Sequence, residues 1–506
     1  MTPVIIDLSN SAHYALALLP EIVLSAWAML VLLVDVFQKG SRQVPSSSWM
    51  GPLTLAGVVL AGIANGWLLT AREASADGMI AVDGFRVFAN YLFLLAVAFF
   101  VLTSERYLNQ ERMRLGELYV LVMFAAVGMM VFAGARELMV IFIALELMSV
   151  PVYVLTGSNR RDVRSAEGAL KYFLLGAFSS AIFLFGIALT YGATGSTNLA
   201  AIARAIGADG VGANPMMLAG VALLGVGFGF KIAAVPFHMW TPDAYDGAPA
   251  PITGFMAGAI KAAAFVAFAR VFLTAFPALY DSWDAIAIWL AVLTMITANL
   301  VALVEGSVKR MLAYSSIAHA GYLLVAIAAA STLGSASMLF YLLVYTLMTM
   351  GAFAVVMIVA GEGEQRVNLE AYQGLGWQRP LLGTAMTVFM LSLAGFPLTG
   401  GFIGKVFILR AAVEKGLIAL AVVLVLASLV SYFYYLRVVW YMWFREADES
   451  TVVAQPRLAA GLRVALAVAV VGLLITGIFP GQMLEVAESS AATLARPQDG
   501  VFGLGR

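Results

Sequence analysis

Long apolar runs separated by short polar loops occupy this chain from one end to the other. A bilayer core about 30 Å thick needs roughly 20 apolar residues per helix, and about fourteen runs meet that requirement. The strands of an outer-membrane barrel would alternate with a period of two, and these runs do not. The sequence therefore predicts an all-α polytopic membrane protein. The expected spans are residues 14–37, 49–70, 87–103, 118–133, 138–156, 168–191, 216–239, 252–276, 283–304, 311–329, 337–360, 381–413, 417–444 and 459–479.

Composition supports this class of protein and excludes others. Charged residues make up 11% of the chain, against roughly 25% in soluble domains. The formal net charge of zero gives no reason to expect a nucleic-acid partner. The chain has no cysteine, which excludes disulfides and Cys-ligated zinc or iron–sulfur sites. Its three histidines are too few for a convincing histidine metal site, so we expect no metal and no cofactor in this chain.

Lysine and arginine in the loops indicate the orientation. An even number of spans places both termini on one side of the membrane. The loops on the opposite side carry about twice as many of these residues, and cytoplasmic loops are the ones enriched in them. We therefore expect both termini outside the cytoplasm. No lysine or arginine precedes the first apolar run, so the N-terminus does not resemble a signal peptide.

Four ionisable residues lie well inside expected spans: Glu146, Lys231, Lys261 and Lys405. Each charge costs about 2.5–3.5 kcal/mol at the centre of a spanning helix, so such residues are rare and usually functional. The structural alternative is a set of buried ion pairs. Three cations cannot all pair with one anion, which favours a functional role for the four.

Three further charged or titratable residues lie nearer to span ends. Lys171 has an equally good alternative, because a lysine near a helix end can extend to the headgroups. Arg437 lies in the tyrosine-rich stretch 432–441, and we expect it to be an interfacial anchor held among those tyrosines. His319 can be either a hydrogen-bonded packing residue or part of a polar path.

Two spans contain helix-breaking residues close to a lysine. Pro236 follows Lys231, and the glycine-rich stretch 395–401 with Pro397 precedes Lys405. Proline removes a backbone hydrogen bond, and glycine lets a helix unwind. Unwound backbone at membrane depth is tolerated only where it is buried or lines a cavity. Paired breaks in two halves of a chain are typical of transporters built from inverted repeats.

Buried lysines suit the transport of protons better than the transport of metal ions. Desolvation favours the neutral form of a lysine and a nearby carboxylate favours the charged form. A lysine that changes its distance from Glu146 can therefore load and release a proton. Alkali cations would instead require carbonyl and carboxylate ligands. We interpret the buried residues as a proton relay.

Five segments together resemble a known family: FKIAAVPFHMWTPDAYDGAPAPITGFMAGAIKAAAF, ALELMSVPVYVL, KRMLAYSSIAHAGYLL, LSLAGFPLTGGFIGK and YFYYLRVVWYMWF. The chain is similar, over nearly its whole length, to the antiporter-like membrane subunits of bacterial respiratory complex I, the proton-pumping NADH:quinone oxidoreductase. The loop WTPDAYDGAP resembles the N type rather than the L and M types. Asp246 and Ala250 depart from the family pattern, which often has Glu and Thr there.

The resemblance implies two inverted five-helix repeats, each with one broken helix. The corresponding division is an N-terminal segment 1–116, a first repeat 117–276, a second repeat 277–444, and a last helix with a tail at 445–506. The resemblance further implies a proton-translocating subunit driven by NADH-to-quinone electron transfer elsewhere. NADH, FMN, iron–sulfur clusters and quinone would belong to partner subunits. The expected partners are neighbouring antiporter-like and small membrane subunits in the bacterial inner membrane, and the termini would be periplasmic.

The resemblance also assigns roles to individual residues. Glu146 and Lys231 correspond to the acid and lysine of one half-channel, Lys261 to the linking lysine and Lys405 to the lysine of the second half-channel. Accessory positions of the same path correspond to Lys171, His238 and His319. One alternative is a subunit of a multi-subunit Mrp-type cation/proton antiporter. Another is a membrane spacer whose buried charges have no function.

Overall fold

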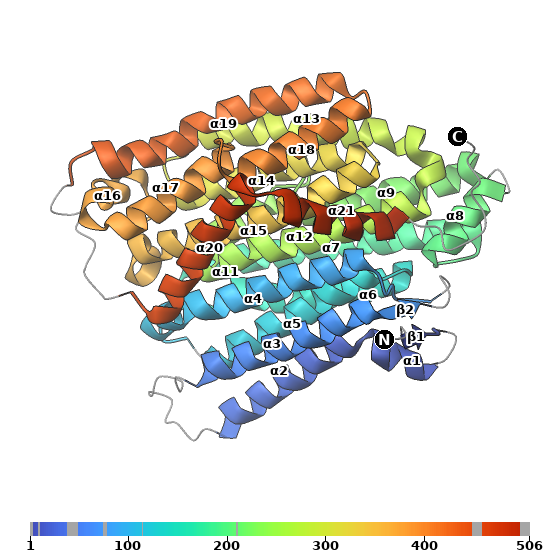
Figure 1. Ribbon diagram of the computed structural model, residues 1–506, viewed down its shortest axis with the longest axis horizontal. Helices are drawn as coiled ribbons and strands as arrows, with labels where there is room; N and C mark the ends of the chain where they lie inside the picture. The colour runs from blue at the N-terminus through green and yellow to red at the C-terminus, as the bar shows by residue number, and fades with distance from the viewer. Residues whose placement is uncertain are drawn as a thin grey trace.

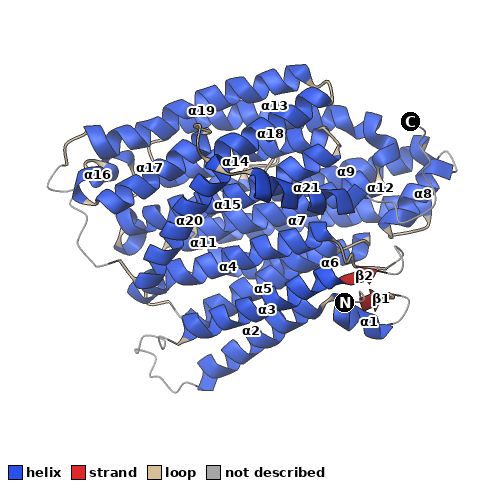
Figure 2. Ribbon diagram, in the orientation of Figure 1, coloured by secondary structure: helices blue, strands red, loops and turns tan. Residues whose placement is uncertain are grey.

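Helices make up nearly all of the regular structure (Figure 2). The computed structural model describes residues 4–8, 11–37, 49–73, 78–113, 115–208, 211–447 and 458–495. Within these ranges, 13 helices are long and apolar enough to cross a membrane, and Pro380–Ala394 is a shorter apolar helix. Most of the long helices run roughly along the long axis of Figure 1. The prediction of an all-α polytopic membrane protein is confirmed.

The N-terminal segment contributes three long helices at one edge of the bundle (Figure 1). A two-stranded parallel sheet, which the sequence did not lead us to expect, accompanies them. Asp83 caps the third long helix by accepting a hydrogen bond of 2.8 Å from the Arg86 amide. The elements are β1 (Val4–Ile6), α1 (Ser11–Ala17), α2 (Leu19–Phe37), α3 (Met50–Trp67), η1 (Leu68–Thr70), β2 (Ala71–Glu73) and α4 (Gly84–Gln110).

The next stretch contains the first broken helix, between α9 and α10. A short π-helical turn, η3, interrupts the helix that follows the break. The elements are α5 (Leu115–Gly134), α6 (Leu138–Thr156), α7 (Val163–Thr194), α8 (Leu199–Ala208), η2 (Val211–Ala213), α9 (Pro215–Ile232), α10 (Trp240–Gly247), α11 (Ala250–Phe255), η3 (Met256–Ile260) and α12 (Lys261–Ala275).

The remaining stretch contains the second broken helix, between α17 and α18, which the sequence analysis treated as the single span 381–413. The elements are η4 (Pro277–Leu279), α13 (Tyr280–Val304), α14 (Val308–Ala328), α15 (Thr332–Ala360), η5 (Glu362–Glu364), η6 (Leu369–Tyr372), α16 (Leu375–Gln378), α17 (Pro380–Ala394), α18 (Gly400–Glu414), α19 (Ile418–Phe444), α20 (Ala460–Ile478) and α21 (Gly481–Ala495).

Helix α21 lies where the sequence analysis expected only a tail. It continues from α20 and packs along α15 and α4 (Figure 1). Small residues allow this close packing: the Phe85 amide donates a hydrogen bond of 3.0 Å to Thr493 Oγ1, and Gly84 lies beside Ser490. Helix α21 therefore packs on the bundle rather than extending away from it.

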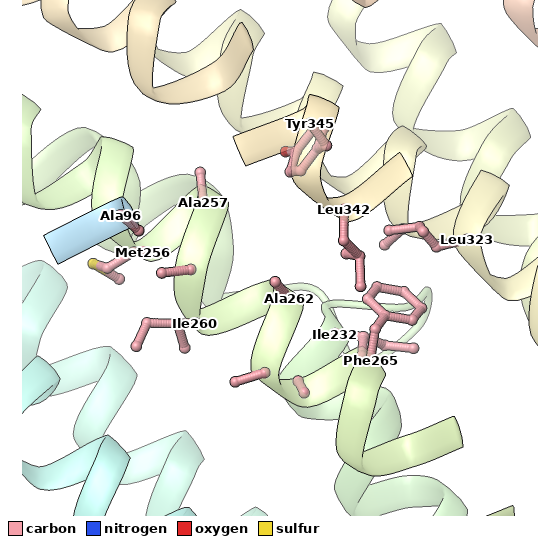
Figure 3. Packing of buried hydrophobic residues seen from close by; sticks show 14 of the residues in the cluster. Ala96, Ile232, Met256, Ala257, Ile260, Ala262, Phe265, Leu323, Leu342 and Tyr345 are labelled. Atoms are coloured by element: carbon pink, nitrogen blue, oxygen red, sulfur yellow. The ribbon is translucent and has the colours of Figure 1, made fainter. Parts of the chain in front are cut away.

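The centre of the bundle is formed by the α11–α12 helix together with α14 and α15. In the most apolar stretches of Ala250–Ala275 and Val308–Ala328, 94% of the residues are buried, against 28% in Leu19–Phe37. Figure 3 shows Met256, Ile260 and Phe265 on the helix of residues 250–275, together with Leu342 of α15. Polar side chains on these central helices are therefore shielded from lipid and from bulk water.

Candidate functional site

Lys231 lies in the last turn of α9, where the first break begins. The helix ends there because Ala233 adopts a left-handed conformation with φ of 60° and Pro236 follows. Lys231 is 3% exposed. Its Nζ donates a hydrogen bond of 2.7 Å to Ser149 Oγ on α6 and lies 3.5 Å from Tyr153 Oη. The Nζ atom is also 5.5 Å from the centre of the Tyr153 ring, a distance suited to a cation–π contact.

Glu146 lies on the same helix as Ser149, the partner of Lys231, but it forms no ion pair with Lys231 among the described residues. Ser149 is three residues after Glu146 on α6, so both lie on the same helical face. The Ser149 hydroxyl accepts from Lys231 and donates to the Leu145 carbonyl. Glu146 Oε1 is buried and has no hydrogen-bond partner among the described residues. The carboxylate is thus free to receive a proton or a donor that approaches it.

Lys261 begins α12, immediately after the π turn of residues 256–260. Turns of this kind are frequent at functional sites. The side chain is 1% exposed. Its Nζ donates to the Ser316 carbonyl at 2.6 Å and also to the Ser316 hydroxyl. The ammonium group is therefore held by neutral oxygens of α14.

His319 lies one turn further along α14 and is fully buried. Its Nδ1 is 2.6 Å from Tyr341 Oη on α15, and its Nε2 is 3.0 Å from Tyr435 Oη on α19. The Tyr435 hydroxyl also bonds to the hydroxyl of Ser315. His319 thus lies in a polar cluster between the helices that carry Lys261 and Lys405, and its two hydrogen bonds agree with both a packing role and a place in a polar path.

Lys405 lies on α18 and reaches back across the second break. Its Nζ donates to the carbonyls of Leu393 and Ala394, at 3.0 and 2.8 Å, at the end of α17. Gly395, with φ of 89°, turns the chain there. A cation at this position satisfies free carbonyls and complements the negative end of the helix dipole. Lys405 Nζ also lies 4.8 Å from the centre of the Tyr322 ring.

Of the three accessory positions, His319 lies in the buried cluster, whereas Lys171 and His238 are less buried. The Lys171 side chain is 44% exposed and pairs with Glu167 and Asp243, each at 2.7 Å. His238 lies in the first break, half-buried, and its Nδ1 has no hydrogen-bond partner in the described part of the chain.

Arg437 is a correction to the sequence analysis. It donates to the Leu303 carbonyl at 3.1 Å and to the Glu305 carbonyl, so it caps the end of α13. Tyr434 and Tyr435 are fully buried, and their hydroxyls bond to Asn299 and His319 rather than holding the guanidinium. A helix turns about 100° per residue, so neighbours in one aromatic run face both the interior and the rim.

Several polar residues of the cluster were missed from the sequence. They are Ser149, Ser315, Ser316, Tyr341 and Tyr435. Helical spacing is the signal that could have found two groups of them: Ser149 stands three residues after Glu146, and the two serines stand three and four residues before His319. Nothing in the sequence pairs Tyr435 with His319, because they lie on different helices.

Asp83, in the loop before α4, forms an ion pair with Arg270 near the C-terminal end of α12. Burial alone would raise the pKa of Asp83, but the Arg270 guanidinium, at 2.8 Å, lowers it below its ordinary value. Within the described ranges, no group of three His, Cys, Asp or Glu side chains is placed to hold a metal ion.

Comparisons with known proteins identify relatives of the whole chain. Residues 135–431 match the family described as "NADH:quinone oxidoreductase/Mrp antiporter, TM". A protein of Trichlorobacter lovleyi named "NADH-quinone oxidoreductase subunit N" is 47% identical over 477 residues, covering 94% of this chain and 96% of the relative. A chain of respiratory complex I from Thermus thermophilus with bound aureothin superposes with a TM-score of 0.76 at 37% identity, covering 93% of this chain and 100% of that one.

A more distant structural likeness concerns the fold alone. A chain of the Mrp complex from Dietzia sp. superposes with a TM-score of 0.77 at 21% identity, over 96% of this chain and 98% of that one.

Proposed function

Because this chain belongs to the subunit N family of NADH-quinone oxidoreductase, within the wider NADH:quinone oxidoreductase/Mrp antiporter family, we propose that it carries protons through the membrane along its buried lysines. It is a multi-pass membrane subunit of a respiratory enzyme complex. The relay comprises Glu146, Lys231, Lys261, His319 and Lys405.

The observation that carries the proposal is the kind of partner each lysine has. Lys231, Lys261 and Lys405 are at least 94% buried, since their exposed fractions are 3%, 1% and 6%. None of them forms an ion pair with a carboxylate among the described residues; their hydrogen-bond partners are serine and tyrosine hydroxyls and backbone carbonyls. Neutral partners do not fix the charge of a lysine, so the ammonium group can lose its proton without leaving a carboxylate buried alone.

Other buried cations in the same protein show the contrast. Each has a carboxylate partner: Lys309 with Glu364 at 2.5 Å, Arg270 with Asp83 at 2.8 Å, and Arg86 with Glu21 at 2.7 Å. Paired charges of this kind hold helices together and resist a change of protonation. The unpaired lysines are therefore a separate class, which supports a transport role over a purely structural one.

Membership of this family supports the remaining parts of the proposal. Electrons pass from NADH to quinone in partner subunits, which hold the FMN and iron–sulfur centres, while this chain holds none. The chain resides in a bacterial inner membrane with both termini periplasmic, beside other antiporter-like and small membrane subunits. Residues 117–276 and 277–444 act as two inverted repeats, each providing one half-channel. Lys171 at the rim and His238 at the first break serve as accessory positions.

The test is proton pumping by the complex in membrane vesicles after Lys231→Met. We expect coupled quinone reduction and pumping to fall at least about tenfold, since a positioned proton-transfer group typically contributes about 10²–10⁴-fold. Electron transfer from NADH to ferricyanide should persist. The matched control is Lys415→Met, because Lys415 is exposed at the end of α18. Wild-type pumping by the Lys231 variant would overturn the relay, and sodium-dependent proton exchange without NADH would favour an antiporter.

A further inference from the structure

The cluster around His319 contains a tyrosine hydroxyl that links two helices. This hydroxyl is not one of the relay groups described above. Tyr435 Oη lies between Ser315 Oγ on α14 and His319 Nε2, 3.0 Å away. We propose that the Tyr435 hydroxyl passes protons between the serine pair beside Lys261 and His319. This inference rests on the proposed function and extends it to a residue outside the lysines.

The first step of the argument is the environment of the imidazole. His319 is fully buried, and each ring nitrogen faces a tyrosine hydroxyl: Nδ1 faces Tyr341 and Nε2 faces Tyr435. A neutral imidazole has one donor and one acceptor nitrogen, whereas the imidazolium has two donors. A hydroxyl can donate or accept, so the two tyrosines satisfy the ring in both tautomers and in the charged form. The ring can therefore change its protonation without leaving an unsatisfied nitrogen.

The second step is the connection toward Lys261. Ser315, the other partner of the Tyr435 hydroxyl, precedes Ser316, whose carbonyl and hydroxyl accept from Lys261 Nζ. Tyr435 has a single hydroxyl hydrogen, so it donates either to the serine or to the histidine. When a proton arrives from the serine side, Tyr435 gives its own hydrogen to Nε2 and takes the new one. The hydroxyl is restored, and its hydrogen bonds now point the other way.

The third step is the connection toward Lys405. Tyr341, on the far side of the ring, packs directly against the backbone of Gly404, the residue before Lys405. The sequence of groups Ser315, Tyr435, His319 and Tyr341 thus extends from α14 across α19 and α15 to the face of α18. This series consists of side chains from three separate helices, so a small shift of one helix would interrupt the series.

Tyr434 provides a matched control beside Tyr435. It is also fully buried on α19, and its hydroxyl donates a hydrogen bond of 2.9 Å to Asn299 Oδ1. Phenylalanine at either position keeps the aromatic ring; it removes one buried hydrogen bond at Tyr434 and two at Tyr435. The two substitutions therefore cost similar packing, and only one of them interrupts the contact with His319.

The experiment measures proton pumping by the whole complex, in H₂O and in D₂O, for Tyr435→Phe and Tyr434→Phe. We expect the first variant to pump at least about tenfold more slowly, with a larger solvent isotope effect than the wild type because proton transfer has become limiting. Tyr434→Phe should stay within about twofold of wild type. Co-purification of this chain with the complex reports assembly, and ferricyanide reduction by NADH reports intact redox partners. If Tyr435→Phe fails to assemble, Ser315→Ala removes the other end of the same link and should give the same pair of effects.

Other outcomes overturn the proposal. Suppose that Lys231→Met is impaired but Tyr435→Phe, or Ser315→Ala where that variant replaces it, pumps at the wild-type rate. This result would remove Tyr435 from the path and leave the lysine relay intact. Equal losses in the two phenylalanine variants, with no change in the isotope effect, would assign Tyr435 a packing role. Wild-type pumping in Lys231→Met would instead refute the proposed function itself.

Discussion

Replacing two buried lysines by methionine should destabilise the protein to very different extents. Lys309 donates to Glu364 at 2.5 Å and to the carbonyls of Asp246 and Ala248. Lys231 donates to Ser149 and has no carboxylate partner in the described ranges. Methionine has a similar length and carries no charge. The difference between the two sites is therefore the presence of an anion that the substitution would leave behind.

The structure sets the expected magnitudes. Lys309→Met leaves the Glu364 carboxylate buried, with Tyr107 and the Ala250 amide as its remaining donors. Removing one partner of a buried pair costs about 3–5 kcal/mol, whereas replacing a buried charge that leaves no counter-ion is close to neutral or stabilising. We expect Lys309→Met to lose that amount and Lys231→Met to lose less than about 1 kcal/mol.

The assay is the midpoint temperature at which this chain dissociates from the purified complex. Arg410→Met is the control for an exposed pair, because Arg410 and Glu414 are both more than half exposed, and such pairs contribute about 0–1 kcal/mol. Lys309→Met combined with Glu364→Gln should recover part of the loss. Equal destabilisation by Lys231→Met and Lys309→Met would refute the separation of relay lysines from structural ones.

Two further predictions concern the surroundings of the relay. Gly404→Ala should slow pumping because the added Cβ would collide with the Tyr341 ring, although alanine favours a helix over glycine by about 1 kcal/mol. The control is Gly207→Ala, whose added Cβ meets nothing within 4 Å. Equal pumping by the two variants would contradict the importance of the contact between Gly404 and Tyr341. Asp83→Asn should lower the thermal stability of the complex at neutral pH. Because Arg270 lowers the pKa of Asp83, the ionised carboxylate stabilises the fold above about pH 4 and less as the pH falls through that lowered pKa. The stability difference between wild type and Asp83→Asn should therefore shrink in acid, and a difference independent of pH would contradict this.

The arrangement of the spans was predictable because the bilayer imposes length and apolarity on every crossing. The breaks were predictable for the same local reason, since Pro236 and Pro397 cannot continue a helix. The buried lysines stood out because a charge inside an apolar run is rare. These features depend on residues close together in the sequence.

The contacts between different helices could not be predicted in the same way. Tyr435 bonds to His319 across 116 positions of the chain, and no local pattern encodes that contact. The partners of Lys405 are backbone carbonyls, which every sequence has, so only the geometry of the break reveals them. The inward and outward faces of the tyrosine run near Arg437 likewise depend on how α19 packs, which led the sequence analysis to the wrong partner.

The most direct test of the account is the number of protons pumped per NADH oxidised by a complex that carries Glu146→Gln, Lys231→Met and Lys405→Met together. These substitutions remove charge from both proposed half-channels and leave the paired cations in place. The account predicts that pumping and coupled quinone reduction collapse in a complex that still reduces ferricyanide. Pumping at the wild-type ratio would contradict it and would make the buried charges dispensable.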